Sequence, residues 1–148
     1  MGLQTVPIKL LREGARLPVR ATVDSAGADL YACLDAPVTI SPGETAMIPT
    51  GLAMAIPAGW AGLVFARSGL ATKQGLAPAN KVGVIDADYR GEVLVSLHNH
   101  SGQPQTVQHG DRIAQLVIMP YLTAEFIQTD TLSETRRGEG GFGSTGRG

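Results

Sequence analysis

Arg67, Ser68 and Gly69 combine a guanidinium, a hydroxyl and a glycine at one point of the chain. Residues 68–74 are the only stretch predicted to be helical, with Ser68 as the N-cap. Unpaired backbone N–H groups at a helix start, together with an arginine, favour an anion. The triplet therefore predicts a phosphate site, and the alternative is an ordinary capped helix with an arginine on its surface.

Asp86 is a candidate general base, because it ends the apolar run 82–85 where a turn begins. Residues 80–91 predict a strand, a turn and the start of another strand. A carboxylate at a strand end can face a pocket and stay ionised near pH 7, as a general base must. The alternative is a turn-capping aspartate. Tyr89, in the same turn, either lines that pocket or covers an edge of the core.

Two more polar side chains lie among apolar neighbours. Period-two alternation along 112–118 places Gln115 on one face with Ile113 and Val117, so its amide needs partners. A backbone bond across the sheet would satisfy it, and so would a polar ligand. Asp29 stands in a Gly-Ala-Asp-Leu context and fits a paired structural acid.

Composition changes abruptly after Ser133. Residues 136–148 contain six glycines, three arginines and one large apolar side chain, Phe142. Such a segment cannot build a core, so we expect a mobile arm that orders on binding, or a tail without function. Phe142 offers a stacking ring, Arg137 a phosphate partner and Ser144 a hydroxyl donor. We place the domain boundary here, with a β domain at 1–135 and the arm at 136–148.

Short apolar stretches separated by turn signals must position these groups. Glycine and proline punctuate them, as at Ser41-Pro42-Gly43 and Pro57-Ala58-Gly59. The expected strands are 6–11, 28–34, 38–40, 45–57, 61–66, 82–85, 92–99, 106–108, 112–120 and 124–128. Many short strands without long helices predict an all-β, antiparallel jelly-roll or barrel-like domain.

Bulk properties exclude several classes of function. Twelve Lys plus Arg against thirteen Asp plus Glu give a net charge of −1, too balanced for stable phosphate-driven binding of nucleic acid. No signal-peptide pattern or long apolar run is present, so we expect a cytoplasmic protein with no membrane attachment. Cys33 is the only cysteine, which leaves a packed thiol as the simplest expectation.

Five segments, in this order and spacing, resemble the motifs of the trimeric dUTPase family. They are 26–32, 66–71, 80–91, 110–116 and 137–144. The resemblance spans nearly the whole chain. It implies a homotrimer with sites between subunits that hydrolyses dUTP to dUMP and diphosphate. Such an enzyme limits uracil incorporation into DNA and supplies dUMP for thymidylate synthesis.

The resemblance also implies roles for residues. Asp86 activates the water that attacks the α-phosphorus, and Gln115 holds that water and the α-phosphate. Asp29 reaches Mg²⁺ through coordinated water, which suits an ion that keeps waters and takes ligands from phosphates. The residues implied to bind substrate are Arg67, Ser68 and Gly69 for phosphates, Asn80, Gly83, Val84 and Ile85 for uracil, Tyr89 and Leu94 for the sugar pocket, and Arg137, Phe142, Gly143 and Ser144 from the arm. For Leu94, a plain core role is equally consistent.

Three other functions stay open. A dCTP deaminase-related enzyme shares the fold but needs a glutamate placed for deamination, which the motifs do not offer. A catalytically silent binding module could keep the scaffold. A His-based metal enzyme would use His98 and His100, whose spacing of two residues would place them on one strand face, but no third ligand accompanies them.

Overall fold

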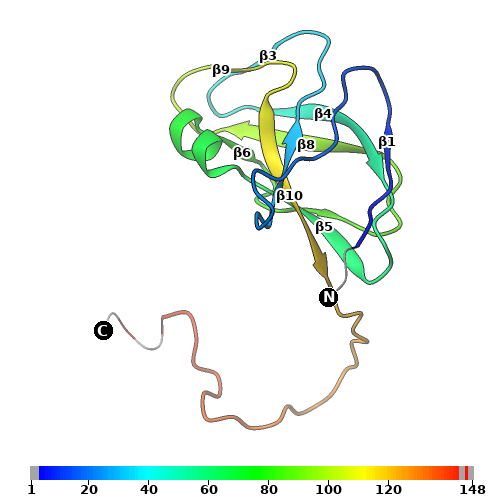
Figure 1. The fold of residues 1–148 in the computed structure, drawn as a ribbon. Helices are drawn as coiled ribbons and strands as arrows, with labels where there is room; N and C mark the ends of the chain where they lie inside the picture. The colour runs from blue at the N-terminus through cyan, green and yellow to red at the C-terminus, as the bar shows by residue number, and fades with distance from the viewer. Residues whose placement is uncertain (1–3, 144–145, 147–148) are drawn as a thin grey trace.

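The protein is built almost entirely from β-strands, as a computed structural model that describes residues 4–143 and residue 146 shows (Figure 1). The described residues form these strands: β1 Ile8–Leu10, β2 Ala28–Tyr31, β3 Val38–Ile40, β4 Thr45–Met54, β5 Trp60–Phe65, β6 Leu76–Pro78, β7 Gly83–Ile85, β8 Glu92–Asn99, β9 Gln105–Val107 and β10 Arg112–Pro120. A single short helical element, η1 Leu70–Gln74, lies between β5 and β6. No helix in the described part of the chain is long and apolar enough to cross a membrane.

Two four-stranded sheets and one two-stranded sheet make up the body. Their strand orders are β1-β4-β8-β6, β2-β10-β5-β7 and β3-β9, and the paired strands run antiparallel. One core cluster contains side chains from both large sheets, such as Leu97 of β8 and Leu30 of β2, each fully buried. This arrangement confirms the predicted all-β, antiparallel jelly-roll fold.

Alternation along the strands sets which side chains enter the core. In β8, Val93, Val95 and Leu97 are buried, whereas Leu94 between them points outward and is 45% exposed. Successive side chains of a strand point to opposite faces, so one face of β8 fills the core and the other is left to line a site. Cys33 is buried, as expected for a packed thiol.

The helical segment covers residues 68–74 as predicted, but its geometry and its cap differ from the prediction. The π-helical residues are Leu70–Gln74, the residue before them is Gly69, and no side-chain capping bond is made there. Ser68 is therefore not the N-cap that the sequence suggested. A π-helical turn is often found at functional sites, and here it begins three residues after Arg67. Gly75, with φ of 69°, ends the turn in the left-handed conformation that glycine adopts without strain.

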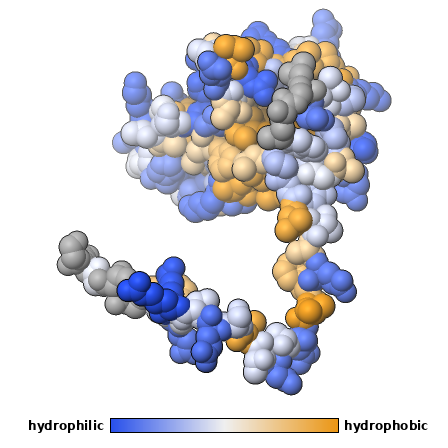
Figure 2. Space-filling view, turned by 60° about the horizontal axis from the view of Figure 1, so that its bottom comes forward, coloured by the Kyte–Doolittle hydropathy of each residue, from blue (hydrophilic) through white to orange (hydrophobic). Residues whose placement is uncertain are grey.

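The strand expected at 124–128 is absent, because these residues have no strand partner. The backbone N–H of Tyr121 still bonds to Gly59 O at 3.0 Å, and beyond it the chain leaves the body as an extended segment (Figure 1). Apolar side chains are spaced along this segment (Figure 2), and Leu122, Phe126 and Ile127 are 77–96% exposed. The extended part thus begins well before residue 136, where composition alone placed the arm.

Candidate active site

One cavity of about 280 Å³ gathers most of the residues predicted to read a nucleoside. Its lining includes Asn80, Gly83, Val84, Ile85, Asp86, Tyr89 and Leu94. They come from β7, from the turns before and after it, and from the first residues of β8. We call this the hairpin cavity.

The edge position of β7 matters for what the hairpin cavity can bind. In the order β2-β10-β5-β7, strand β7 pairs only with β5, through Val64↔Gly83, Leu63↔Val84 and Gly62↔Ile85. An edge strand leaves a row of backbone N–H and C=O groups unpaired on its outer side. Those groups can hydrogen-bond to a flat heterocycle with a fixed donor and acceptor pattern, whereas the Ile85 side chain is buried in the core.

Tyr89 is held at the mouth of the turn rather than against the core. Its side chain is 45% exposed, and its hydroxyl donates to the main-chain oxygen of Glu92 at 2.8 Å. The backbone N–H of Tyr89 bonds to Asp86 O at 3.1 Å, which closes the turn. Leu94 is also 45% exposed, so it lines the cavity and is not a core residue.

A second cavity of about 380 Å³ gathers the predicted phosphate residues, and we call it the arginine cavity. It is lined by Ala21, Ser25, Ala26, Gly27, Asp29, Arg67, Ser68, Gly69, Arg112 and Gln115. Asp29 Oδ1 accepts a hydrogen bond from Arg67 Nε at 2.8 Å, and Asp29 Oδ2 lies 3.5 Å from a terminal nitrogen of Arg112. Asp29 is thus a paired acid, and its carboxylate holds two cations at the cavity wall.

Gln115 makes the backbone bond that the sequence left open. Its Nε2 donates to Ala66 O at 2.8 Å, next to Arg67, while its backbone pairs with Phe65 of β5 and Asp29 of β2. Gly27 gives this amide room, because a Cβ at that position would overlap Gln115 Oε1. The side chain is fixed, and it lies in the arginine cavity rather than beside Asp86.

The two cavities have no lining residue in common. Within one chain, the structure therefore brings Asp86 together with the residues predicted to read uracil, and Gln115 together with the residues predicted to bind phosphates. It does not bring the two groups into one cavity. Asp86 and Gln115 of one chain therefore cannot act on the same phosphorus atom from a single cavity in this arrangement.

The arm residues stay apart from both cavities. Arg137 Nε donates to Gly140 O at 2.6 Å, a contact within the arm itself. Phe142 is fully exposed and has a positive φ of 50°, and Gly143 has a φ of 89°. Ser144 lies outside the described residues. None of residues 137–143 lines either cavity.

Sequence reasoning missed Arg112 as a site residue, and it missed a pair at the rim of the hairpin cavity, Arg12 and Glu92. The two terminal nitrogens of Arg12 donate to the two carboxylate oxygens of Glu92 at 2.9 and 2.8 Å. This hydrogen bonding lowers the pKa of Glu92 from its usual 4.5, against the opposing effect of burial, with the Gly51 N–H contributing further. It also raises the pKa of Arg12. The partners are 80 residues apart, so no pattern in the sequence near either residue predicts that they pair.

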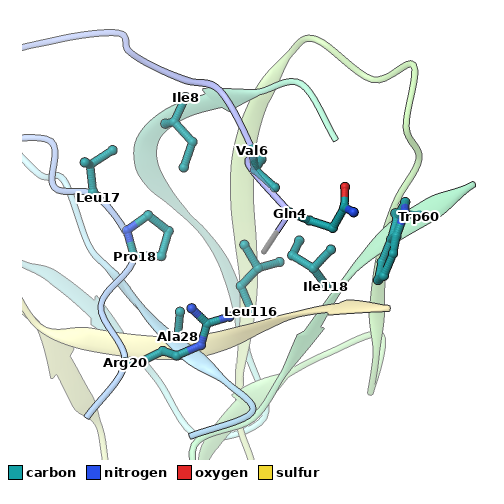
Figure 3. Close-up of a pocket in the computed structure, with 10 residues that line it drawn as sticks. All are labelled: Gln4, Val6, Ile8, Leu17, Pro18, Arg20, Ala28, Trp60, Leu116 and Ile118. Atoms are coloured by element: carbon teal, nitrogen blue, oxygen red, sulfur yellow. The ribbon is translucent and has the colours of Figure 1, made fainter. Parts of the chain in front are cut away.

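A larger cavity of about 750 Å³ lies elsewhere, beside the N-terminal segment and the outer part of β10 (Figure 3). Its lining is mainly apolar, including Val6, Ile8, Trp60 and Ile118. None of the predicted catalytic or substrate-binding residues is among its lining residues. It is not the candidate active site.

The described residues contain no group of three or more His, Cys, Asp or Glu side chains that could hold a metal ion. His98 Nδ1 bonds to Thr45 Oγ1 at 3.0 Å, and His100 Nε2 bonds to Ala71 O at 3.1 Å. Strand β8 ends at Asn99, so the two imidazoles do not share a strand face. The geometry does not support a His-based metal enzyme.

Comparison with known proteins gives consistent matches. The dUTPase family profile matches residues 13–146. A deoxyuridine 5'-triphosphate nucleotidohydrolase of Desulfitobacterium hafniense is 58% identical over 132 residues, covering 88% of this chain and 87% of that protein. A solved mutant dUTPase of Staphylococcus bacteriophage 80alpha with dUpNHpp is 32% identical, with a TM-score of 0.89, covering 98% of this chain and 100% of that one. A solved mutant dUTPase from phage phi11 of S. aureus, described as revealing the coordination of a structural Mg(II) ion, is 30% identical, with a TM-score of 0.77 and coverage of 86% and 98%.

Proposed function

Because this chain belongs to the dUTPase family, we propose that it hydrolyses dUTP to dUMP and diphosphate by in-line attack of water at the α-phosphorus. The observation that carries the proposal is the hairpin cavity, where the six residues implied to read deoxyuridine line one space together with Asp86. The reaction consumes a free cytoplasmic nucleotide, limits uracil incorporation into DNA and supplies dUMP for thymidylate synthesis.

Uracil recognition rests on the free edge of β7. The outer backbone groups of Gly83, Val84 and Ile85 present donors and acceptors in a rigid array, and Asn80 adds an amide beside Gly83. A base with a different pattern leaves buried polar groups unpaired, at a cost of about 1–3 kcal/mol for each group. The ring of Tyr89 lies under the deoxyribose and leaves no room for a 2′-hydroxyl.

Phosphate binding rests on the arginine cavity. Asp29 holds Arg67 through Nε, which leaves the terminal N–H groups of Arg67 for phosphate oxygens. Ser68 and Gly69 add a hydroxyl and a backbone N–H at the start of the helical turn. Gln115, fixed by its bond to Ala66 O, holds the attacking water and the α-phosphate, and Asp86 removes a proton from that water.

The residues present fit Mg²⁺ only as an ion that takes its ligands from phosphates and water. Asp29 offers one carboxylate, and both of its oxygens already face arginines. That arrangement suits a contact through coordinated water and not an all-protein cage. When bound, the ion would offset charge on the triphosphate.

A homotrimer would join the two cavities. Cyclic symmetry makes each interface from two different surfaces, so the hairpin cavity of one subunit can meet the arginine cavity of the next. The separation of Asp86 from Gln115 within one chain supports this arrangement. The arm then closes over the site, with Phe142 stacked on uracil and Arg137, Gly143 and Ser144 near the γ-phosphate, which excludes bulk water.

The proposal is tested by measuring diphosphate release from dUTP, dTTP, dCTP and UTP, with Mg²⁺ and with chelator. We expect dUTP to be strongly preferred, chelator to suppress turnover, and Asp86→Asn to be inactive while binding nucleotide. An inactive wild type that binds a protein partner would instead favour the silent binding module.

Ammonia release from dCTP would favour the deaminase alternative. Glu92 does line the hairpin cavity, but Arg12 occupies both of its carboxylate oxygens. That glutamate is therefore not free to act on a base, and we expect no ammonia.

A further inference from the structure

The Arg12–Glu92 pair ties the N-terminal segment to the hairpin cavity. Arg12 follows β1, whose pairing with β4 brings the arginine to the first residue of β8. The two parallel hydrogen bonds of 2.9 and 2.8 Å form a bidentate contact, the geometry in which guanidinium and carboxylate bind best. The Glu92 side chain is only 21% exposed, so the contact is partly shielded from water.

The backbone around Glu92 needs such support, because the β4–β8 ladder is interrupted there. The register shifts between Pro49↔Leu94 and Ala53↔Glu92, and Gly51 within the shift has a positive φ of 71°. Side chains replace the missing ladder bonds. Glu92 Oε2 accepts from Gly51 N at 3.4 Å, and Thr50 Oγ1 donates to the main-chain oxygen of Val93 at 2.6 Å.

This supported backbone carries the only side-chain hydrogen bond of Tyr89 among the described residues, from its hydroxyl to Glu92 O at 2.8 Å. Gly91 lies against the same ring, since a Cβ added there would come within 2.5 Å of the Tyr89 hydroxyl oxygen. With 45% of the side chain exposed, little else restrains the ring. Its orientation therefore depends on where Glu92 is held.

We propose that Arg12 and Glu92 are positioning residues that fix the Tyr89 ring and thereby set the preference for deoxyribose over ribose. The inference rests on the proposed function, in which Tyr89 lies under the sugar. A displaced ring opens space beside the 2′ position. The pair acts through Tyr89 and touches no reacting atom.

The test compares kcat/KM for dUTP and for UTP in the full-length protein and in Arg12→Met. We expect the dUTP to UTP ratio to fall about tenfold, mainly through a higher kcat/KM for UTP, with kcat for dUTP changed less than about threefold. Arg12→Lys, which can make one of the two bonds, should restore part of the ratio. Arg16→Met removes a cation of the same segment that lies over the Tyr31 ring instead, and should leave the ratio unchanged.

A double-mutant cycle separates positioning from simple stabilisation. Tyr89→Phe removes the hydroxyl that transmits the effect, so Arg12→Met should not change the ratio further in that background. Additive effects on the ratio, or a ratio unchanged in Arg12→Met, would overturn the inference. If Arg12→Met does not fold, Glu92→Gln takes its place in the cycle, because glutamine keeps the size of the side chain and loses the charge. A wild type unable to release diphosphate from dUTP would refute the proposed function instead, and the two failures are therefore distinct.

Discussion

Mixing two inactive variants tests whether each site is shared between subunits. Asp86→Asn disables the hairpin cavity, and Gln115→Ala disables the arginine cavity; the two cavities share no lining residue. Each variant alone should retain about 10⁻² to 10⁻⁴ of wild-type turnover, the usual loss for a general base or a group that orients the nucleophile. If one chain supplied a whole site, mixing would restore nothing.

The recovered activity follows from the geometry. In a trimer with one kind of interface, a site needs Asp86 from one subunit and Gln115 from the next. When equal amounts of the two variants assemble at random, half of the subunits supply an intact hairpin cavity, and half of their neighbours supply an intact arginine cavity. About a quarter of all sites are then intact, so the mixture as a whole should show about a quarter of wild-type turnover, with one intact site in each trimer that contains both variants.

The assay is diphosphate release after co-expression or after unfolding and refolding of the mixture, with each variant treated alone as a control. Thermal unfolding of each variant establishes that both fold. Activity of the mixture that stays at the level of the separate variants would refute a shared site. A mass measurement of the assembly fixes the subunit number in the same samples.

Three other perturbations have definite expected outcomes. Removing residues 136–148 should abolish most turnover and leave the melting temperature within about 2 °C of wild type, because the hydrogen bonds of the described arm residues reach no further than Thr135; full activity would exclude a lid. Gly91→Ala should displace the flexible end of Tyr89, costing about 1 kcal/mol or less in unfolding free energy while raising turnover of UTP relative to dUTP; an unchanged ratio would show that the ring does not read the sugar. Arg12→Met should lower the unfolding free energy at pH 7 by about 1 kcal/mol, the scale of a partly exposed pair. Since the pKa of Glu92 is depressed in the folded state, this difference should shrink as pH falls below the ordinary 4.5, and a difference that grows in acid would contradict the assignment.

Local patterns predicted the parts of the fold that depend on local physics. The strand expected at 92–99 is observed with the same bounds as β8, one face of which is buried while the other is not. Gly43, Gly59 and Gly110 mark turns with φ of 78°, 85° and 84°, conformations that glycine adopts at no steric cost. These features require only neighbours in the sequence.

Features that depend on distant partners were missed. Strand β6, Leu76–Pro78, is three residues long and ends in proline, and it exists because β8 supplies its hydrogen bonds at Leu97–Asn99. Ser68 was expected to cap the helical segment, but Ser68 is itself helical, the residues 70–74 that follow are π-helical, and no side-chain capping bond is made. Arg12 and Glu92 meet only because β1 pairs with β4. The candidate site was predicted residue by residue through the family motifs, whereas its division into two cavities was not.

The wrong strand prediction at 124–128 and the division of the site into two cavities have a common explanation. The segment has strand-like composition, yet within one chain it has no sheet edge to join, and Phe126 and Ile127 stay exposed to water. Burying two such side chains elsewhere would be favourable by about 1.5–3 kcal/mol each. In a single chain, the extended segment exposes apolar side chains to water at a cost in free energy. The arm touches neither cavity, and the two cavities do not form one site. All three become useful at once if a neighbouring subunit receives the segment and completes the site, which is the arrangement that the mixing experiment tests.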